Sequence, residues 1–273
     1  MRNNCPRMER RVKSERVVLV VSDPHCGHKV GLTHPDFDSV PSKNNSVEYA
    51  LWKYRRECWN WCCATAKEIK PDIVILNGDA VDGKGDKTGG TELITSDRGE
   101  QVDMAVALLE QFGARNIYIS FGTPYHSGNF EDWEKQVADK VHADKIGSHD
   151  WLSVNGLVLD YRHHVSSSSV PYGRTLSISR ERTWNLMWSD KDYGFPRADV
   201  LIRSHVHYFS YAGGRGWLAM TTPALQGIGT KFGARRMSGT VDFGVVSFKI
   251  RDKENWTWQY HLLEASKRLP IEA

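Results

Sequence analysis

Short apolar runs alternate with amphipathic stretches along the first half of the chain. Three runs rich in Val, Ile and Leu predict buried strands at 17–21, 72–76 and 116–121. Apolar residues that recur every three or four positions predict helices over 45–69, 99–112 and 130–141. Asn45, with Glu48 three positions later, forms a capping-box arrangement, and Pro71 ends the first helix. Strands and helices that alternate in this way indicate an α/β fold with parallel strands and right-handed crossovers.

The second half of the chain has a different pattern, in which glycines separate shorter segments. Residues 151–154 and 157–162, joined by Asn155-Gly156, predict a hairpin with a tight turn. A helix is expected over 174–189, followed by a short strand over 199–202. From there onward the alternating segments predict antiparallel strands.

Five of the predicted strands run directly into loops that carry Asp or His. The side chains in these loops are Asp23, His25, Asp79, Asp82, His126, His163, His164, His205 and His207. Six of the eleven histidines therefore lie at strand ends, whereas chance placement would scatter them over helices and faces as well. Sites in such sheets form at the carboxyl ends of the strands, so these side chains are expected to share one edge. A set of imidazoles and carboxylates of this size suits two adjacent divalent ions, with one aspartate able to bridge them.

Five motifs in this order resemble those of the calcineurin-like metallophosphoesterases. They are Asp23-Pro-His25, Gly78-Asp79-Ala-Val-Asp82, Gly122-Thr-Pro-Tyr-His126, His163-His164 and Ser204-His205-Val-His207. The first two match closely, and the ordered set, which spans roughly 17–210, is far more specific than any one motif. The resemblance implies an α/β sandwich of two mixed sheets, built from βαβ units and flanked by helices. We expect one metallophosphoesterase domain over 17–273, preceded by a basic lead-in of residues 1–16.

The resemblance also implies two divalent ions and their ligands. For one ion these are Asp23, His25, Asp79 and His207. For the other they are Asp79, His205 and either His163 or His164. Because successive strand residues point to opposite faces, only one of the paired histidines is expected to be a ligand, with His163 slightly favoured. Asp82 is expected to support its loop rather than a metal. Manganese is the expected metal, and iron, zinc and nickel also suit these ligands.

The third motif departs from the family pattern, which is Gly-Asn-His, with the Asn on the second metal. In this chain Thr123, His126 or a water would take the place of that Asn. His126 is expected near the metals, either as a ligand or as the acid that protonates the leaving group, and with Asp79 it is a catalytic candidate. The last motif has Ser204 where glycine is usual. The variant third motif and the paired histidines resemble members carried by phages and prophages.

The activity that the resemblance implies is hydrolysis of a phosphate ester by a water that two ions activate. A phosphodiester is the leading substrate. DNA and RNA are candidates only because of the net charge of +3 and the polar loop 83–97. The alternative enzyme is a phosphomonoesterase for a nucleotide or a phosphoprotein. The alternative from another class is a metal-binding module with impaired catalysis, against which the retained carboxylates and both His205 and His207 argue.

Cysteine usage and hydropathy indicate where the protein acts. Of five cysteines, Cys58, Cys62 and Cys63 fall in one predicted helix and are expected to be buried thiols, which fits a reducing compartment. The chain shows no signal peptide and no apolar segment of membrane-spanning length. We therefore expect a cytoplasmic protein without a membrane partner, in the host cytoplasm if phage-encoded. Beside the first motif, Cys26 is expected to pack internally. His28 could approach the site, but an exposed position in its loop is favoured.

Overall fold

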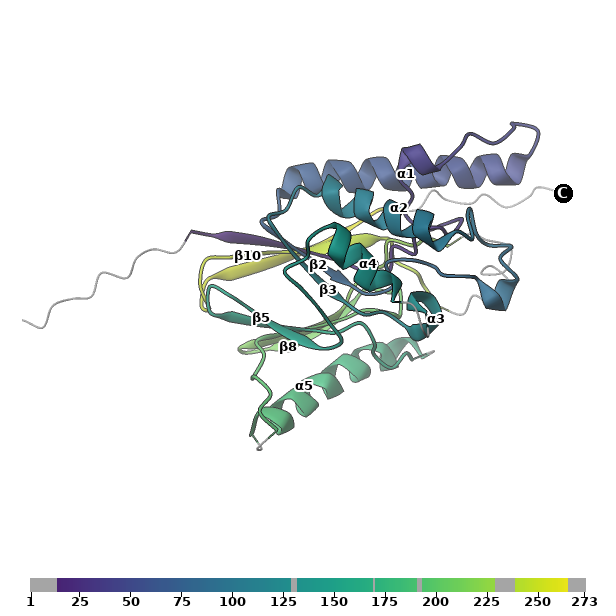
Figure 1. Ribbon diagram of the computed structural model, residues 1–273. Helices are drawn as coiled ribbons and strands as arrows, with labels where there is room; N and C mark the ends of the chain where they lie inside the picture. The colour runs from purple at the N-terminus through teal and green to yellow at the C-terminus, as the bar shows by residue number, and fades with distance from the viewer. Residues whose placement is uncertain (1–13, 129–131, 169, 191–192, 229–238, 265–273) are drawn as a thin grey trace, which may run out of the picture.

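Two β-sheets lie face to face, and helices cover the outer side of each (Figure 1). This computed structural model describes residues 14–128, 132–168, 170–190, 193–228 and 239–264. The predicted α/β fold of two mixed sheets with flanking helices is confirmed. Of the expected basic lead-in, residues 1–13 lie outside the described part, and Arg16 already belongs to the first strand.

The first sheet has six strands in the order β11-β10-β1-β2-β3-β4. Its parallel strands are β1 (Arg16–Val21), β2 (Ile73–Asn77), β3 (Asn116–Ser120) and β4 (Lys145–Gly147). The other two are β10 (Gly244–Ile250) and β11 (Trp256–Leu262), an antiparallel pair whose β10 also runs antiparallel to β1. The carboxyl ends of β1, β2 and β3 therefore meet at one edge, where their loops can share a site.

The second sheet has five strands in the order β5-β6-β7-β9-β8. They are β5 (Asp150–Val154), β6 (Leu157–Tyr161), β7 (Val200–Arg203), β8 (Ser210–Gly214) and β9 (Trp217–Thr221). The β5–β6 hairpin is confirmed. The expectation of antiparallel strands after β7 holds for the β8–β9 and β10–β11 pairs but is wrong for β9 against β7. After β7 the next strand, β8, lies at the edge of the sheet and not beside β7. The strand that follows, β9, forms a hairpin with β8, lies between β8 and β7, and is therefore parallel to β7.

Three helices lie over the outer face of the first sheet: α1 (Ser46–Ile69), α2 (Arg98–Gln111) and α4 (Trp133–Lys140). The second sheet carries α5 (Arg174–Asp190). As predicted, Asn45 caps α1 by accepting a hydrogen bond from the Glu48 N–H, and the helix ends before Pro71. Short 3-10 turns occur at η1 (Pro35–Phe37), η2 (Asp86–Thr88) and η3 (Pro171–Gly173). Across the described ranges, every helix is too short or too polar to span a membrane.

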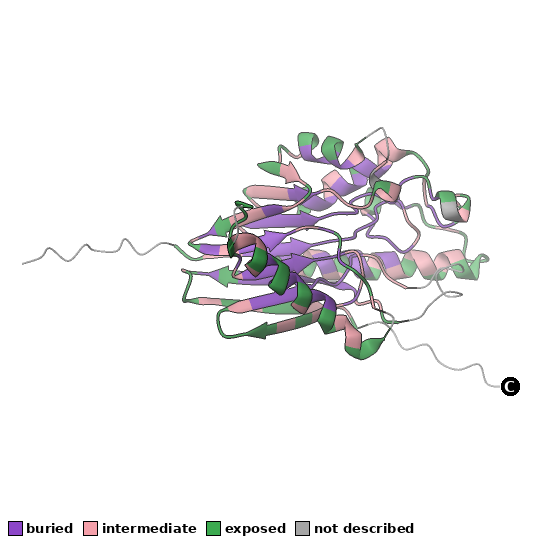
Figure 2. Ribbon diagram, turned by 90° about the horizontal axis from the view of Figure 1, so that it is seen from below, coloured by how far each residue is buried: buried purple, intermediate pink, exposed green. Residues whose placement is uncertain are grey.

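The apolar run of β1 is buried on both faces of its sheet. Val18 and Val20 pack between the two sheets, whereas Leu19 and Val21 pack beneath the helices. This double burial explains why the strand is a continuous apolar run rather than an alternating one. Figure 2 shows the same layering, with buried central strands and exposed outer helix faces.

Two elements near the strand ends were not predicted. One is β4, and the other is α3 (Pro124–Ser127), a single turn that begins inside the third motif. Pro124 occupies the first turn of α3, where its missing N–H costs nothing. The helix expected over 130–141 begins at Trp133 in the described structure, and residues 129–131 lie outside it.

Candidate metal centre

The loops after β1, β2, β3, β6 and β7 bring most of the predicted side chains together. The candidate ligand atoms form groups whose members lie within 4.8 Å of one another. These groups are Asp23–His25–His207, Asp79–His163–His205 and His25–Asp82–His126. The first two correspond to the two ligand sets that the sequence motifs imply.

Asp79 lies between these two sets. Its Oδ2 is 3.1 Å from His163 Nε2 and 3.9 Å from His25 Nε2. On the other side, His207 Nε2 is 3.2 Å from Asp23 Oδ1 and 3.3 Å from His25 Nε2. Asp79 therefore lies within reach of residues from both groups.

Two buried atoms of the cluster lack a hydrogen-bond partner within the described structure: Asp23 Oδ1 and His163 Nε2. A buried carboxylate oxygen or imidazole nitrogen without a partner is costly, and such groups in native proteins are usually paired or coordinate a metal. Imidazole nitrogen and carboxylate oxygen together suit manganese, iron and zinc. The residues present therefore fit a pair of divalent ions.

Each of the two central aspartates has one oxygen fixed by the backbone and the other directed at the cluster. Asp23 Oδ2 accepts a hydrogen bond from the backbone N–H of His205 at 3.3 Å, which leaves Oδ1 facing His207. Asp79 Oδ1 accepts hydrogen bonds from the N–H and the hydroxyl of Thr123, at 2.7 and 3.0 Å. Thr123 therefore orients the Asp79 carboxylate.

Three imidazoles are oriented through their Nδ1 atoms. His163 Nδ1 donates to the backbone oxygen of Asn77, and His126 Nδ1 to that of Asp82, both at 2.8 Å. His25 Nδ1 donates to the Asp82 carboxylate at 3.0 Å. Because these oxygens only accept, they keep a proton on Nδ1, so Nε2 is the nitrogen that is left to a metal ion. Asp82 thus holds His25 through its carboxylate and His126 through its backbone oxygen, and its expected role in supporting the loop stays a prediction.

The backbone of the ligand loops is held in an uncommon conformation. The described part has eight non-glycine residues with positive φ, and five are candidate ligands: Asp23, His25, Asp79, His205 and His207. Such positions cost roughly 1–3 kcal/mol each and persist where the surrounding structure imposes them, often at functional sites. Gly78 has a φ of 81°, and a Cβ there would lie 2.4 Å from His163 Nδ1. Glycine before Asp79 is therefore required for the close approach of His163.

Burial and neighbouring charges act in opposite directions on the pKa values of the cluster. Burial alone would raise the pKa of Asp79, but the imidazole of His163, whose Nε2 lies 3.1 Å from Asp79 Oδ2, outweighs it and holds that pKa far below its usual range. Burial alone would lower the pKa of His163, but the carboxylates of Asp23 and Asp79 outweigh it and raise the pKa to about 10. Burial lowers the pKa of His205 to about 4, and the charge of His163 adds to this effect. His163 therefore carries a proton that a metal ion would displace.

The cluster lines an open cavity of about 310 Å³. The other residues that line it are His28, Gly85, Thr88, Glu92, Tyr125 and Gln226. The prediction that His28 lies exposed is wrong, because the loop before α2 pairs with it through Leu93 and leaves it half-buried. Burial lowers the pKa of His28 to about 4, so its ring is neutral at pH 7.

A family model for calcineurin-like phosphoesterases matches residues 16–238. The chain belongs to this family. Divalent metal ions are typical of calcineurin-like phosphoesterases, and the candidate ligand groups of this chain are consistent with that property. Among curated proteins, none matches the sequence.

Several solved structures are similar to this calcineurin-like phosphoesterase. An archaeal phosphodiesterase is 12% identical, with 90% of this chain and 99% of that chain covered and a TM-score of 0.44. Vps29 from Chaetomium thermophilum is 11% identical, with 91% and 95% covered and a TM-score of 0.44. Vps29 from Cryptosporidium parvum is 13% identical, with 92% and 99% covered and a TM-score of 0.42. The family assignment rests on the family model and not on these distant structures.

In this family member the paired histidines have different surroundings. His163 is buried, whereas His164 is exposed and belongs to none of the candidate groups found among the described residues. The His164 ring lies 4.8 Å from that of His205, centroid to centroid. This placement follows the alternation of strand residues and favours His163 as the ligand, which stays a prediction.

Sequence reasoning missed Glu134, a fully buried residue in the first turn of α4. Its Oε1 accepts a hydrogen bond from the N–H of Ala80 at 3.1 Å, and its Oε2 accepts one from the N–H of Gly122 at 2.6 Å. It thereby ties the loop that carries Asp79 to the loop of the third motif. Burial raises the pKa of Glu134 to about 7, and the charge of Asp79 adds to this effect. The sequence feature that could have indicated a buried Glu134 is its position on the same helix face as the apolar residues Val137 and Ala138.

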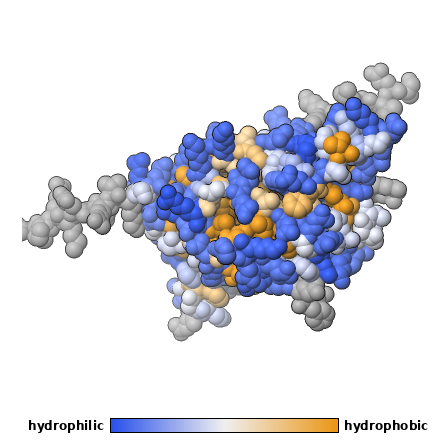
Figure 3. All heavy atoms as spheres, turned by 45° about the horizontal axis from the view of Figure 1, so that its top comes forward, coloured by the Kyte–Doolittle hydropathy of each residue, from blue (hydrophilic) through white to orange (hydrophobic). Residues whose placement is uncertain are grey.

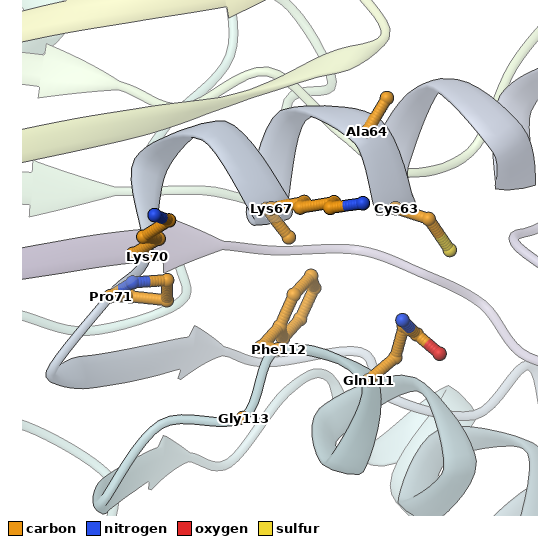
Figure 4. Close-up of a pocket in the computed structure, with 9 residues that line it drawn as sticks. Cys63, Ala64, Lys67, Lys70, Pro71, Gln111, Phe112 and Gly113 are labelled. Carbon is orange, nitrogen blue, oxygen red and sulfur yellow. The ribbon is translucent and has the colours of Figure 1, made fainter.

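A second hollow, of about 490 Å³, lies away from this centre, between the C-terminal ends of α1 and α2 (Figure 4). Cys63, Lys67, Lys70 and Phe112 are among its lining residues. Burial raises the pKa of the Cys63 thiol, which makes it a poor nucleophile.

The face that carries α1 is mostly hydrophilic, with apolar side chains gathered near its middle (Figure 3).

Proposed function

We propose that the protein is a phosphodiesterase that uses two divalent metal ions, with manganese as the preferred metal. The observation that carries this proposal is the position of Asp79 between the Asp23–His25–His207 and Asp79–His163–His205 groups, at an open cavity. Bound there, the ions would lower the pKa of a water and neutralise charge that develops on the phosphoryl oxygens.

Other residues of the protein orient the side chains of the candidate ligands. Asp82 and Asn77 hold His25 and His163 with Nε2 toward the centre, and Thr123 holds Asp79. His126 lines the cavity with its Nδ1 fixed on the Asp82 backbone oxygen. Burial lowers the pKa of His126, and the charge of His25 adds to this effect, so the neutral imidazole is favoured. That form suits a ligand in place of the missing Asn, whereas a general acid must carry the proton.

The lining of the cavity favours a diester over a monoester. Among its described side chains none is Lys or Arg, and Glu92 adds a carboxylate. A phosphomonoester carries more negative charge than a diester, and sites for such groups are usually rich in Arg and Lys. A singly charged phosphodiester therefore suits this cavity better.

Hydrolysis of bis-p-nitrophenyl phosphate and of p-nitrophenyl phosphate, each with added manganese, tests the proposal. We expect faster turnover of the diester by the wild type and loss of that turnover in Asp79→Asn. Faster turnover of the monoester would identify a phosphomonoesterase instead. A protein that binds manganese but hydrolyses neither ester would be a metal-binding module.

We also propose a cytoplasmic location. Cys26, Cys58 and Cys62 are buried free thiols, as the sequence predicted. The prediction that Cys63 is buried as well is wrong, because this thiol is half-buried. Free thiols in this number fit a reducing compartment. Fractionation of the native host cell, with detection by antibody, tests the location, and recovery outside the cytoplasm would overturn it.

A further inference from the structure

Fully buried polar side chains lie at the carboxyl ends of strands from both sheets. Each is the last residue of its strand or directly follows it: Ser22, Asn77, Ser120, Ser204 and Thr222. Elsewhere the space between the sheets is filled mainly by apolar side chains, such as those of Val20 and Phe248. Replacing hydrogen-bonded partners in a core by apolar groups of the same shape is often nearly neutral for stability. Stability alone therefore does not explain why this part of the core is polar.

The side-chain amide of Asn77 is held on both of its polar atoms. Its Oδ1 accepts a hydrogen bond from the Ser120 hydroxyl at 2.6 Å, and its Nδ2 donates to the backbone oxygen of Arg162 at 3.0 Å. Because a carbonyl oxygen only accepts, the NH₂ group must face Arg162. The same NH₂ group donates to the Ser204 hydroxyl at 2.6 Å. The orientation of the amide is therefore fixed, with Ser204 as one of its two acceptors.

Ser204 continues these hydrogen bonds toward the first strand. Because its Oγ accepts from Asn77, its own proton is available to the Thr222 hydroxyl, which lies 2.7 Å away. The Thr222 hydroxyl is 2.8 Å from that of Ser22, which donates to the backbone oxygen of Pro223 at 3.0 Å. One consistent direction of donation thus runs from Asn77 to Pro223. Hydrogen bonds aligned in this way strengthen one another.

Asn77 and Ser204 also hold the candidate ligand His163 between them. The backbone oxygen of Asn77 accepts from His163 Nδ1 at 2.8 Å, and the backbone N–H of Ser204 donates to the His163 oxygen at 2.8 Å. With the bond between the Asn77 and Ser204 side chains, these hydrogen bonds close a ring through the three residues. The direction of the His163 imidazole therefore depends on Asn77, and the position of Asn77 depends on Ser204.

The other members of the same ligand group adjoin this ring in the chain. Asp79 follows Asn77 by two positions, and His205 directly follows Ser204. The whole Asp79–His163–His205 group is thus attached to the Asn77–Ser204 pair, by sequence or by a hydrogen bond.

We propose that Ser204 is a positioning residue, which acts through Asn77 to hold the His163 imidazole in the direction that a metal ion needs. The inference rests on the metal binding in the proposed function. Without the Ser204 hydroxyl, the Asn77 amide loses one acceptor, and the backbone oxygen that orients His163 is held less firmly. Ser204 is also the position at which the last motif departs from the family pattern, and a glycine there would offer no hydroxyl to Asn77.

Manganese binding by Ser204→Ala, measured by titration calorimetry on metal-free protein, tests the inference. Loss of a group that orients a metal ligand typically weakens metal binding about 10- to 100-fold. We expect a loss in this range for one of the two ions, with the other bound as in the wild type. Wild-type affinity for both ions would overturn the proposal.

Matched controls remove other buried hydroxyls. Thr222→Val keeps the shape of a fully buried side chain and removes the hydroxyl that Ser204 meets, but it leaves the ring through His163 intact. Ser247→Ala removes a buried hydroxyl of β10 that pairs with His261. Both controls should bind manganese as the wild type does. Equal weakening in Ser204→Ala and Thr222→Val would show a structural role only and would overturn the proposal.

A proton signal separates positioning from general stability. In zinc-loaded protein, which is diamagnetic, the His163 Nδ1 proton is the imidazole signal in the NMR spectrum that His163→Ala lacks. Exchange of this proton with water should be faster in Ser204→Ala than in the wild type and unchanged in Thr222→Val, because only the first variant weakens the ring. Equal exchange in Ser204→Ala and the wild type, or equally fast exchange in both variants, would overturn the proposal.

A second variant and the choice of readout keep the test decisive. If Ser204→Ala does not fold, Ser204→Cys takes its place, because a thiol remains a weak acceptor for Asn77. A smaller loss of affinity in the same direction is then expected, and no loss would overturn the proposal. Neither readout needs turnover, so the outcome is separate from that of ester hydrolysis. A protein that hydrolyses neither ester but loses affinity in Ser204→Ala would keep the positioning residue and lose the phosphodiesterase, and hydrolysis with an unaffected Ser204→Ala would do the opposite.

Discussion

Replacing Glu134 by alanine should destabilise the protein and loosen the metal centre. Glu134 accepts hydrogen bonds from the backbone N–H groups of Ala80, which directly follows Asp79, and of Gly122 in the third motif. A buried N–H that loses its partner costs roughly 1–3 kcal/mol, so the two together cost about 2–6 kcal/mol. For a chain of this size each kcal/mol lowers the melting temperature by about 2–4 °C. The expected fall is therefore roughly 4–24 °C.

Glu134→Gln separates the two hydrogen bonds. Glutamine keeps one acceptor oxygen but turns an NH₂ group toward the second N–H, so about half of the loss is expected. The control is Glu110→Ala, which removes an exposed glutamate from α2 and should change stability by less than about 0.5 kcal/mol. Melting is followed by calorimetry and manganese affinity by titration. A Glu134→Ala protein that melts and binds manganese like Glu110→Ala would refute the reasoning.

The pH dependence supplies a second readout for Glu134. Its pKa in the folded protein is about 7, raised from 4.5, so the folded state binds the proton more tightly than the unfolded state does. Its contribution to stability is therefore fully present below pH 4.5 and is lost as the pH rises through 7. In metal-free protein the advantage of the wild type over Glu134→Gln should shrink between pH 5 and pH 8. An advantage that grows over this interval would contradict the assigned shift.

The remaining predictions concern the cluster itself. Asp79→Asn should abolish diester hydrolysis, whereas Asp82→Asn, which acts through the histidines, should lower it about 10- to 100-fold, and equal losses in well-folded variants would count against a bridging Asp79. His163→Ala should weaken manganese binding in titrations and His164→Ala should not, so equal effects would refute the placement of the pair. If His126 is a ligand, His126→Ala should slow good and poor leaving groups alike with partial rescue by excess manganese. If it is a general acid, only poor leaving groups should lose about 10²–10⁴-fold, and wild-type rates on both would place it outside the site.

The metal centre could be predicted because its information is local in sequence. A buried strand that ends in Asp-Pro-His or Gly-Asp identifies both the position and the chemistry of its side chains. The different surroundings of His163 and His164 follow from strand alternation in the same way. The matching family model and the two mixed sheets confirm the family and the fold, and the ligand assignments stay predictions.

What sequence reasoning missed depends on contacts between distant segments. Glu134 accepts hydrogen bonds from the backbone N–H groups of Ala80 and Gly122, which are distant in sequence, so the residues around Glu134 show no pattern that predicts these bonds. His28 is half-buried because Leu93 pairs with it, which a single loop does not reveal. Likewise β9 becomes parallel to β7 only because β8 takes the edge of the sheet.

The central claim is that two ions held by the strand-end cluster hydrolyse a phosphodiester. The most direct measurement is the rate of bis-p-nitrophenyl phosphate hydrolysis while manganese is titrated into metal-free protein. We predict little activity until the first equivalent is bound, a rise with the second, and saturation at two ions per chain. Full activity at one equivalent, or no hydrolysis at any manganese concentration, would contradict the account.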